Sequence, residues 1–466
     1  MLSRRLCAVT SSAGPFVGPF IGSLALSAGL AHAQADFPAL FVSNNGNLEG
    51  SITSFAVEPD GALTLVDRLV TGTRPSTSVA CGGCNAIRVS LTPDGRFLAT
   101  MHAPGGSTED VVVTAVAPDG TLSEVERITA SEQGLDIQWI NDAVLATATT
   151  TFGPGNLLRL YNWDGQDLSL SDAVPSGEFF TDMELHPNGR WLYTNDSFQN
   201  TVRLFEILPT GGANNGPSAV LVQTLSIPVF GTQLAVDPSG RFLYAAGGIS
   251  AGGNAFSGFT IDQTTGELSL IVDGPGAGVF TSPGASPKNF AVVPVDGGPD
   301  LLYVGHGTDA TVRGFSIDPA TGVPTSTGVT FDVGTQGTLR ELDAGVLNGE
   351  NVLFVVDQTD SSDGLEGPYL FDVADAGTLT PGPGSPTPTD GISPEDAEFW
   401  PGPSGPQPCS LADLVVPFGF IDLSDVDAFI AAFNVGDALA DVAFPFGIVD
   451  LSDVDAFIAS FLGGCP

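Results

Sequence analysis

Short runs of alternating apolar and polar residues, separated by turns rich in Gly and Pro, make up most of the chain. Seven of these runs share one pattern, in which an apolar triplet is followed by a polar loop and a second alternating strand. The middle residues of the triplets follow one another at steps of 47 to 59 residues. The triplets are Leu40-Phe41-Val42, Phe97-Leu98-Ala99, Val144-Leu145-Ala146, Trp191-Leu192-Tyr193, Phe242-Leu243-Tyr244, Leu301-Leu302-Tyr303 and Val352-Leu353-Phe354. Strands repeated at this spacing predict an all-β, seven-bladed β-propeller over residues 36–400.

The two ends of the repeated region complement each other. The first unit lacks a strand before its triplet, whereas the last unit has a spare one at Glu395–Trp400. We therefore expect this spare strand to become the innermost strand of the first blade and to pair with Ala39–Ser43. Such pairing would close the ring of blades and leave no open sheet edge between its two ends.

Three strand pairs carry the closest likeness to a known family: Trp191–Asn195 with Thr201–Phe205, Leu302–Val304 with Thr311–Asp318, and Phe259–Asp262 with Thr265–Leu268. These segments resemble the seven-bladed propellers of the lactonase family, the 6-phosphogluconolactonase-like proteins. The resemblance implies a propeller fold and the hydrolysis of lactones. It also implies His and Arg on inner strands, where this sequence has Pro287-Lys288-Asn289 and Thr181-Asp182.

One register of the predicted inner strands holds a polar residue in every blade. The residues are Arg88, Asp136, Asp182, Gln233, Asn289, Glu341 and Asp396. In a propeller they would surround the central channel. Four carboxylates in such a ring fit a site for a ligand or a cation, and they also fit a water-filled channel whose lining is polar for that reason alone.

Three further residues are candidates for catalysis. Lys288 is the only lysine of the chain, and His102 and His306 fall at equivalent strand ends of the second and sixth units. Both histidines would lie at one rim of the channel. His186 directly precedes a Pro-Asn-Gly turn, where we expect it to be a turn residue.

The first 35 residues have the features of a signal peptide. Arg4 and Arg5 precede an apolar stretch at residues 15–30, and small residues at Ala33 and Ala35 fit a cleavage site. We therefore expect export to a secreted or cell-surface location, and no later segment has the ~18 unbroken apolar residues of a membrane span. The chain has 53 acidic and 14 basic residues, which argues against nucleic acid as a partner.

Four cysteines follow the leader. Their placement predicts the pairs Cys81–Cys84 and Cys409–Cys465 in an oxidising compartment. For Cys81 and Cys84, a redox pair and half of a zinc site are alternatives to a structural loop.

A Pro- and Gly-rich linker at residues 401–408 separates the propeller from a duplicated segment at residues 409–466. Each copy is expected to form a loop and a helix, which makes the tail a small α-helical tandem. The apolar positions are spaced at i, i+3, i+4 and i+7, as on one helix face. They are Val426, Phe429, Ile430 and Phe433 in the first copy and Val454, Phe457, Ile458 and Phe461 in the second.

The tandem resembles a dockerin of the type that ends in Gly-Cys, a module that anchors secreted proteins to a partner protein. The resemblance implies calcium ligands at Asp413, Asp422, Asp425, Asp441, Asp450 and Asp453. These carboxylates fit helix capping equally well. Val415 and Pro417 stand where the dockerin pattern has ligands.

Two functions follow from these features. The first is a secreted scaffold whose propeller binds a small ligand or a protein and which is anchored through the dockerin-like tail. The alternative is a lactone hydrolase in which Lys288 and the channel carboxylates replace the catalytic residues of the family.

Overall fold

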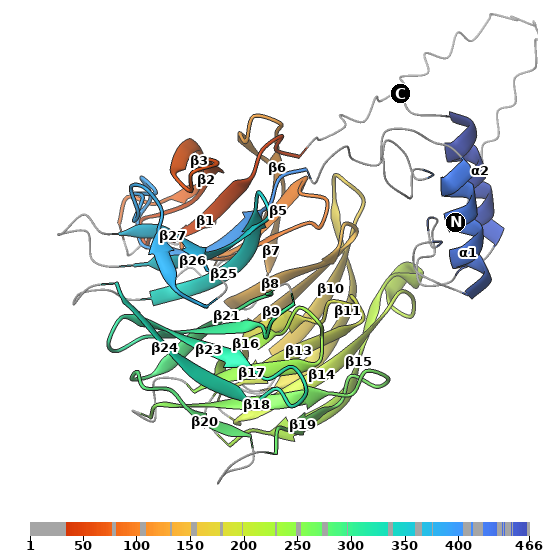
Figure 1. The fold of residues 1–466 in the computed structure, drawn as a ribbon. Helices are drawn as coiled ribbons and strands as arrows, with labels where there is room; N and C mark the ends of the chain where they lie inside the picture. Colours follow the sequence, from red (N-terminus) through yellow and green to blue (C-terminus); the bar gives the residue numbers. More distant parts are fainter. Residues whose placement is uncertain are drawn as a thin grey trace, which may run out of the picture. The chain divides into compact units, whose positions relative to one another are not determined.

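A computed structural model describes residues 34–403 and parts of the C-terminal region (Figure 1). Within the first range, the residues left out are 77–80, 103–108, 131–132, 151–155, 178–179, 198, 229–230, 248–252, 273–277, 296, 334–338, 359–365 and 375. Beyond it, the described residues are 412, 423–435, 440, 442, 449 and 451–463. The proposed leader at residues 1–35 therefore lies almost wholly outside the described residues, as do Cys409 and Cys465.

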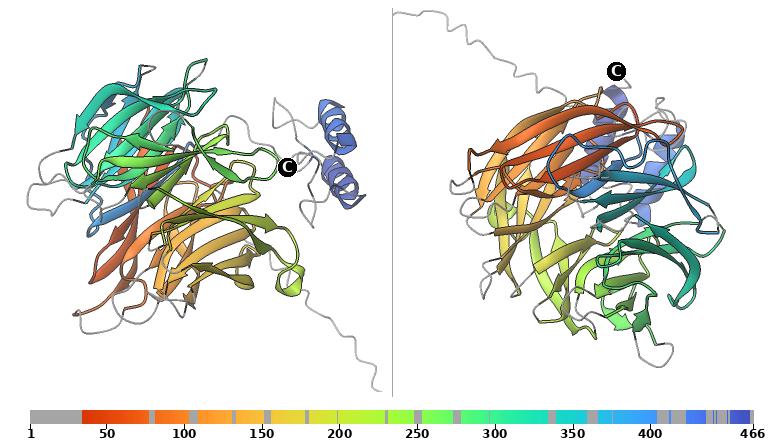
Figure 2. Two further views of the ribbon diagram at one scale, coloured as in Figure 1. Left: turned by 90° about the horizontal axis from the view of Figure 1, so that it is seen from below. Right: turned by 90° about the vertical axis from the view of Figure 1, so that its left-hand side faces the viewer.

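Seven antiparallel sheets follow one another around a common channel (Figure 2). Blade 1 contains β29 (Pro394–Trp400), β1 (Ala39–Asn45), β2 (Glu49–Val57) and β3 (Leu63–Thr73). Blade 2 contains β4 (Ala86–Leu91), β5 (Phe97–His102), β6 (Glu109–Val116) and β7 (Leu122–Ala130). Blade 3 contains β8 (Gln133–Asn141), β9 (Val144–Thr150), β10 (Asn156–Trp163) and β11 (Leu168–Gly177).

The remaining four blades repeat this order. Blade 4 contains β12 (Phe180–Leu185), β13 (Trp191–Asp196), β14 (Thr201–Leu208) and β15 (Ser218–Ser226), with a short 3-10 helix, η1 (Ala213–Asn215). Blade 5 contains β16 (Gly231–Val236), β17 (Phe242–Gly247), β18 (Ala255–Ile261), β19 (Leu268–Leu270) and β20 (Val279–Thr281). Blade 6 contains β21 (Pro287–Val293), β22 (Leu301–His306), β23 (Thr311–Ile317) and β24 (Pro324–Asp332). Blade 7 contains β25 (Leu339–Leu347), β26 (Glu350–Asp357), β27 (Gly367–Val373) and β28 (Leu379–Pro381).

The predicted seven-bladed propeller is confirmed, and so is its closing strand. β29 pairs antiparallel with β1, from Ala39 opposite Trp400 to Ser43 opposite Asp396. The strand begins one residue earlier than expected, at Pro394. Each innermost strand contacts the innermost strand of the next blade, in the closed order β29, β4, β8, β12, β16, β21 and β25.

Every predicted apolar triplet lies in the second strand from the channel. These strands are buried on both faces, since each is packed between neighbouring blades. Phe354 of blade 7, for example, belongs to one apolar cluster with Leu40 and Phe55 of blade 1. This double burial explains why the triplets are continuous apolar runs rather than alternating ones.

Two of the Gly- and Pro-rich turns expected from the sequence, Pro93-Asp94-Gly95 and Pro187-Asn188-Gly189, also form. Gly95 and Gly189 have φ values of +71° and +69°, a region that favours glycine. Turns between outer strands help to join the blades. The hydroxyl groups of Tyr193, Tyr244 and Tyr303 each donate to a glycine carbonyl in a turn of the following blade, at 2.8, 2.7 and 2.7 Å respectively.

The C-terminal region contains two helices, α1 (Leu423–Val435) and α2 (Leu451–Gly463). The rings of Phe429 and Phe457 stack with their centroids 4.2 Å apart, and both residues are 4% exposed. Ile430 and Ile458, which the sequence placed on the same apolar faces as these phenylalanines, are 51% and 48% exposed and so are not buried with them. The helices meet along the phenylalanine faces, and the residue after each stacked Phe is rotated by about 100° away from that contact.

We expect Phe429→Ala to loosen this helix pair, because it removes one half of the buried stack. The expected cost to the pair is about 3–5 kcal/mol, whereas Ile430→Ala, at an exposed position, serves as the matched control. Amide hydrogen exchange of residues 423–463 in the full chain measures both. If the tail is held mainly by calcium rather than by the phenylalanines, a chelator will increase exchange more than Phe429→Ala does.

In the part of the chain that the structure describes, no helix is both long enough and apolar enough to cross a membrane.

Candidate functional site in the central channel

A β-bulge near the start of every innermost strand brings the predicted polar ring together. The ladder shifts register at or beside the ring residue of each blade. A bulge turns the following side chain away from the regular pleat. The bulged strands therefore present one polar side chain per blade at the same level of the channel. The regular alternation of side chains along an unbulged strand would not bring these residues so close to one another.

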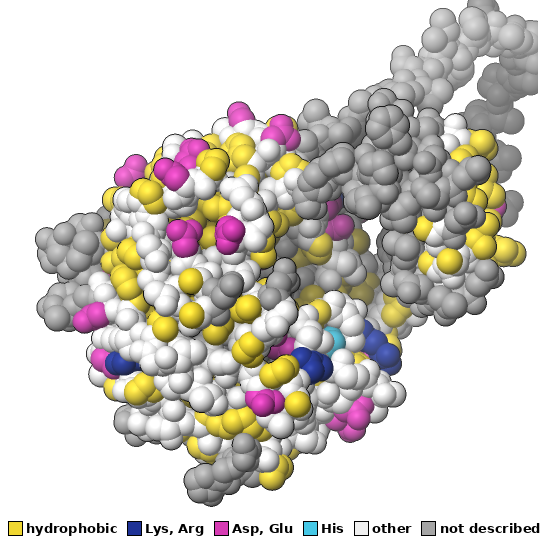
Figure 3. All heavy atoms as spheres, in the orientation of Figure 1, with side chains coloured by type: hydrophobic (Ala, Val, Ile, Leu, Met, Phe, Trp, Pro, Cys, Tyr) yellow, Lys and Arg dark blue, Asp and Glu magenta, His cyan; other side chains and the backbone are white. Residues whose placement is uncertain are grey.

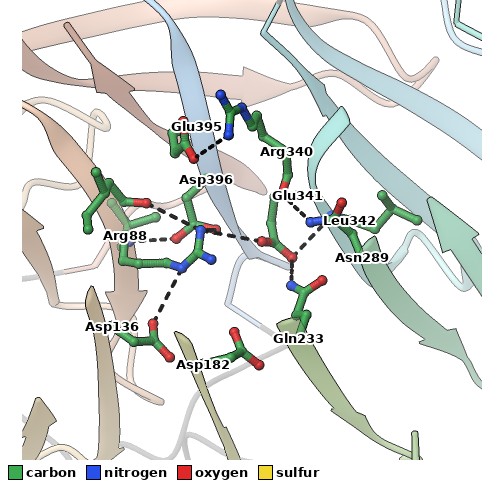
Figure 4. A network of polar contacts seen from close by, with 12 residues as sticks. Arg88, Asp136, Asp182, Gln233, Asn289, Arg340, Glu341, Leu342, Glu395 and Asp396 are labelled. Atoms are coloured by element: carbon green, nitrogen blue, oxygen red, sulfur yellow. Dashed lines mark hydrogen bonds and ion pairs between the residues drawn. The ribbon is translucent and has the colours of Figure 1, made fainter. Parts of the chain in front are cut away.

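Six of the seven ring residues line a cavity of about 240 Å³: Arg88, Asp136, Asp182, Gln233, Glu341 and Asp396. Figure 4 shows them converging from different strands. Asn289 is the exception, since it is 3% exposed and its side-chain amide donates to the Arg340 carbonyl of the next blade.

A second group of polar residues lines the same cavity two positions further along the strands: Gln138, Glu184, Asp343 and Glu398. Sequence reasoning missed this group, although its signal was present. Asp136, Asp182, Glu341 and Asp396 are each followed two residues later by one of these four side chains, and residues i and i+2 of a strand share a face.

Arg88 is the only cation among the described residues that line the cavity. Its guanidinium lies 3.6 Å from Asp136, 3.7 Å from Glu341 and 3.9 Å from Asp396. Burial by itself would lower the pKa of Arg88, but the surrounding carboxylates outweigh it, so the pKa is raised above its ordinary value. Arg88 is therefore a permanent positive charge within an acidic cavity.

The seven carboxyl groups of the cavity are harder to ionise than usual, chiefly because they are buried. Burial raises the pKa of Asp136 to about 7, that of Asp343 to about 7 and that of Glu184 to about 8. The pKa values of Asp182, Glu341 and Glu398 are raised well above the ordinary range by burial and by neighbouring carboxylates, and that of Asp396 is also raised. Protons are therefore shared among these groups near neutral pH.

Several ring carboxylates have a structural role. Oδ2 of Asp396 accepts a hydrogen bond from the Val89 N–H at 2.7 Å, and Oδ2 of Asp182 accepts one from the Leu234 N–H at 2.7 Å. Asp136 accepts one from the Met183 N–H at 2.5 Å. In each case the N–H belongs to the innermost strand of the next blade, which is a sheet edge and would otherwise lack a partner.

Glu341 departs from this arrangement. Its carboxylate extends into the channel and accepts a hydrogen bond from the side-chain amide of Gln233, two blades away (Figure 4). It also lies 3.7 Å from Arg88. Glu341 and Arg88 are thus a carboxylate and a guanidinium that form an ion pair in the lining of the cavity.

The three other catalytic candidates lie outside this lining. His102 is fully buried, with Nε2 3.0 Å from the Thr71 hydroxyl. His306 is also fully buried, between the Ser282 hydroxyl at 2.7 Å and the Thr311 carbonyl at 3.1 Å, and burial lowers its pKa. Lys288 is half-buried at the bulge of β21 and donates to the Leu339 carbonyl at 3.3 Å.

Cys81 and Cys84 form a disulfide, with a Cα–Cα distance of 5.6 Å. The loop that it closes packs on β3, where the Thr71 hydroxyl donates to the Gly83 carbonyl at 2.8 Å. These contacts favour a structural role for the pair.

Among the described residues, no group of three or more His, Cys, Asp or Glu side chains is placed to hold a metal ion. Of the calcium candidates, Asp453 is fully buried and accepts a hydrogen bond from the Val442 N–H at 2.9 Å. Asp413, Asp422, Asp441 and Asp450 lie outside the described residues, as does the side chain of Asp425. Calcium binding by the tail stays a prediction.

Comparisons with known proteins agree with the fold, and part of the chain is similar in sequence to one family. Residues 181–340 match a family model described as lactonase, 7-bladed beta-propeller. This match spans blades 4 to 6 and ends one residue before Glu341. Among curated proteins, no match to the sequence is found.

Solved structures share the architecture at low sequence identity. A putative 6-phosphogluconolactonase from Bacteroides uniformis superimposes with a TM-score of 0.59 and 16% identity, covering 78% of this chain and 100% of that one. The periplasmic gluconolactonase of Pseudomonas aeruginosa has a TM-score of 0.59 and 18% identity, covering 78% and 99%. The chain thus contains a seven-bladed β-propeller, and its middle blades are similar to the lactonase family.

Proposed function

We propose that the propeller hydrolyses lactones in its central channel. The observation that carries the proposal is the ion pair of Glu341 and Arg88 in a cavity whose other charged lining residues are all carboxylates. The similarity of residues 181–340 to the lactonase family supports it. A cavity of about 240 Å³ suits a small ring, because pockets for drug-sized ligands are larger, at about 300–1,000 Å³.

Glu341 is the proposed general base. Its ionised form would take a proton from a water molecule as the water oxygen bonds to the lactone carbonyl carbon. The raised pKa makes Glu341 a stronger base once it is ionised. When the ring C–O bond then breaks, the Glu341 carboxylic acid returns the proton to the departing ring oxygen, and the product is a hydroxy acid.

Arg88 is the proposed electrostatic partner. In the tetrahedral intermediate, negative charge develops on the former carbonyl oxygen, and a buried guanidinium stabilises such a charge without having to reorient. Asp136 and Asp396, each within 4 Å of Arg88, hold the guanidinium in the channel. Gln233 holds the Glu341 carboxylate through its amide group.

The scaffold interpretation and the anchoring of the tail to a partner protein stay predictions, as do export and calcium binding. They rest on the sequence features of residues 1–35, of which the structure describes only 34 and 35, and of residues 409–466, of which it describes mainly the two helices. Lactone hydrolysis has the additional support of the channel geometry.

The test is hydrolysis of glucono-δ-lactone by the chain without its proposed leader, compared with Glu341→Gln. We expect this substitution to lower kcat/KM by about 10²–10⁴-fold, because an amide cannot accept the proton. Activity of the parent chain should rise with pH through the raised pKa of Glu341. Glu206→Gln, at a surface carboxylate paired with Arg190, is the matched control and should retain activity.

Thermal unfolding of each variant separates a lost base from a lost fold. A folded Glu341→Gln protein with undiminished activity would contradict the assigned role. A folded parent chain that hydrolyses no lactone faster than buffer would contradict the proposed function.

A further inference from the structure

A short disulfide loop leads directly into β4, the innermost strand of blade 2. Cys81 and Cys84 close this loop, and they are 3% and 0% exposed. Arg88, the only cation among the described residues of the cavity lining, follows Cys84 by four positions. The bulge between Ala86 and Arg88 lies in this interval and sets the direction of the arginine side chain. The loop is therefore the segment from which the chain enters the strand that carries the positive charge.

The loop packs so closely on blade 1 that glycine is required there. A Cβ atom added to Gly72 would lie well within 3.0 Å of the Gly82 carbonyl oxygen. One added to Gly50 would lie equally close to the Gly83 carbonyl oxygen. The Thr71 hydroxyl donates a hydrogen bond to the same carbonyl of Gly83 at 2.8 Å. The backbones of the loop and of blade 1 are thus in direct contact, and a larger residue at either glycine would displace the loop.

Asn85 continues this contact up to the first residue of β4. It is 7% exposed and has a φ of +57°, a conformation that asparagine adopts more readily than most residues. Its N–H donates to the Gly46 carbonyl at 3.1 Å. Its side-chain amide donates to Oδ1 of Asn45 at 3.0 Å and to Oδ1 of Asn47 at 3.1 Å. These bonds to the turn between β1 and β2 fix the direction in which the chain enters β4.

The guanidinium of Arg88 depends on this backbone for its position. Among the described residues, it donates one hydrogen bond, to the carbonyl of the adjacent Ile87 at 3.4 Å. The carboxylates that it attracts lie 3.6 to 3.9 Å away, which is longer than a hydrogen bond. The charged groups that face it are Asp136 of β8, Asp182 of β12, Glu341 of β25 and Asp396 of β29, together with Lys288 of β21. Attraction at these distances does not fix one orientation, whereas the anchored backbone does.

The disulfide contributes chiefly to local geometry. Its cysteines are three positions apart, and closing so short a loop removes less chain entropy than closing a long one. The charge that it would help to place is also scarce. The chain has 53 acidic and 14 basic residues, and its exposed face shows scattered acidic side chains with few basic ones (Figure 3).

We propose that the Cys81–Cys84 loop is the positioning element of Arg88, so that the electrostatic balance of the cavity depends on the disulfide. When the disulfide is absent, the loop separates from Gly50 and Gly72, and the start of β4 shifts with it. The guanidinium then moves relative to the carboxylates of the four other strands. This inference concerns the cavity itself and does not require that the ligand is a lactone.

The first test measures the charge effect without a ligand. The joint substitution Cys81→Ser with Cys84→Ser and, separately, Gly72→Ala are introduced into the chain without its proposed leader. Arg88 lowers the pKa values of the cavity carboxyls below those that burial alone would give, so its displacement raises them further. The folded state then binds more protons, and its stability falls more steeply as pH rises. In urea unfolding, both variants should lose about tenfold more in the folding equilibrium constant at pH 8 than at pH 5, relative to the parent.

The same substitutions in an Arg88→Met background assign this effect. Its pH-dependent part should vanish there, because no guanidinium is left to displace. Gly298→Ala, whose added Cβ would meet the Val295 side chain at 3.0 Å, is the matched control for Gly72→Ala and should behave as the parent does at both pH values. Equal losses at pH 5 and pH 8 would overturn the proposal, since the disulfide would then only stabilise the loop. A pH-dependent loss that persists with Arg88→Met would assign the effect to another group, such as His102, and would overturn it as well.

Hydrolysis of glucono-δ-lactone provides a second readout, which rests on the proposed function. In the loop variants, kcat/KM should fall by about tenfold, and the rise of activity with pH should move to higher pH because Glu341 loses part of its attraction to Arg88. An active protein whose rate and pH profile are the same in the parent and in both variants overturns the positioning role. A protein that hydrolyses no lactone but shows the pH-dependent loss of stability supports this role and contradicts only the proposed function.

Discussion

Deletion of residues 395–400 should abolish cooperative folding of the propeller. These residues make up nearly all of β29, which pairs with β1 and lies between β4 and β25 in the ring of innermost strands. The deletion removes the Asp396 carboxylate from the Val89 N–H and the Trp400 indole from the Ala35 carbonyl. The expected loss is comparable to the whole stability of a domain, about 5–15 kcal/mol.

A milder variant keeps this prediction testable if the truncated chain cannot be purified. Phe399→Ala removes a ring that is 9% exposed and lies 4.7 Å from Phe354 of blade 7. It should cost about 3–5 kcal/mol, whereas Ile392→Ala, in the exposed segment before the strand, should cost little. Urea unfolding measures both. Equal unfolding midpoints for the parent and the truncated chain would show that β29 does not close the ring.

Replacement of Arg88 by Met should have the second large effect. Among the described residues of the cavity lining, Arg88 is the only cation. Its charge partly offsets the effect of burial, which raises the pKa of Asp136, Asp182, Glu341 and Asp396. Without it, no cation remains among the described residues that line the cavity. The expected cost is about 3–5 kcal/mol near pH 8, the usual penalty for removing one partner from a buried ionic group.

The size of this effect should depend on pH, and the sign follows from the direction of the pKa shifts. In the folded chain the cavity carboxyls have raised pKa values, such as about 7 for Asp136 and about 8 for Glu184, whereas in the unfolded chain they have ordinary values. The folded state therefore binds more protons than the unfolded state between about pH 4 and pH 8. The stability of the parent should fall as pH rises through this window, and that of Arg88→Met should fall more steeply.

Thermal unfolding at pH 5 and pH 8 measures this difference. Arg190→Met, which removes an exposed arginine paired with Glu206, is the control and should shift both values by little. Equal losses for Arg88→Met at the two pH values would mean that packing, rather than charge, accounts for the role of Arg88.

The repeated fold was predictable from sequence because its signals are local. An apolar triplet such as Trp191-Leu192-Tyr193 is buried between neighbouring blades wherever it occurs, so its pattern predicts a strand without knowledge of the partner. Turns such as the one at Gly189 depend on a few consecutive residues. The spare strand at residues 395–400 could be assigned to the first blade because a ring has to close.

The channel ring was only partly predictable. The alternation of polar and apolar residues shows which face of a strand a side chain lies on, but it does not show whether that side chain reaches the cavity. Asp136, Asp182, Gln233, Glu341 and Asp396 meet in one cavity with Arg88, but Asn289 turns to a neighbouring carbonyl. The second acidic level, with Glu184, Asp343 and Glu398, becomes apparent only when the strands are placed around the channel.

The tertiary structure alone decided which polar residues are structural and which face the cavity. His102 and His306 occupy equivalent strand ends, yet both are fully buried against hydroxyl groups of Thr71 and Ser282. The reason is that burial and hydrogen bonding join residues far apart in sequence, such as Asp396 and Val89, which are 307 positions apart. The raised pKa values of the cavity carboxyls have the same non-local origin. They arise when four innermost strands, β8, β12, β25 and β29, bring these groups together away from water.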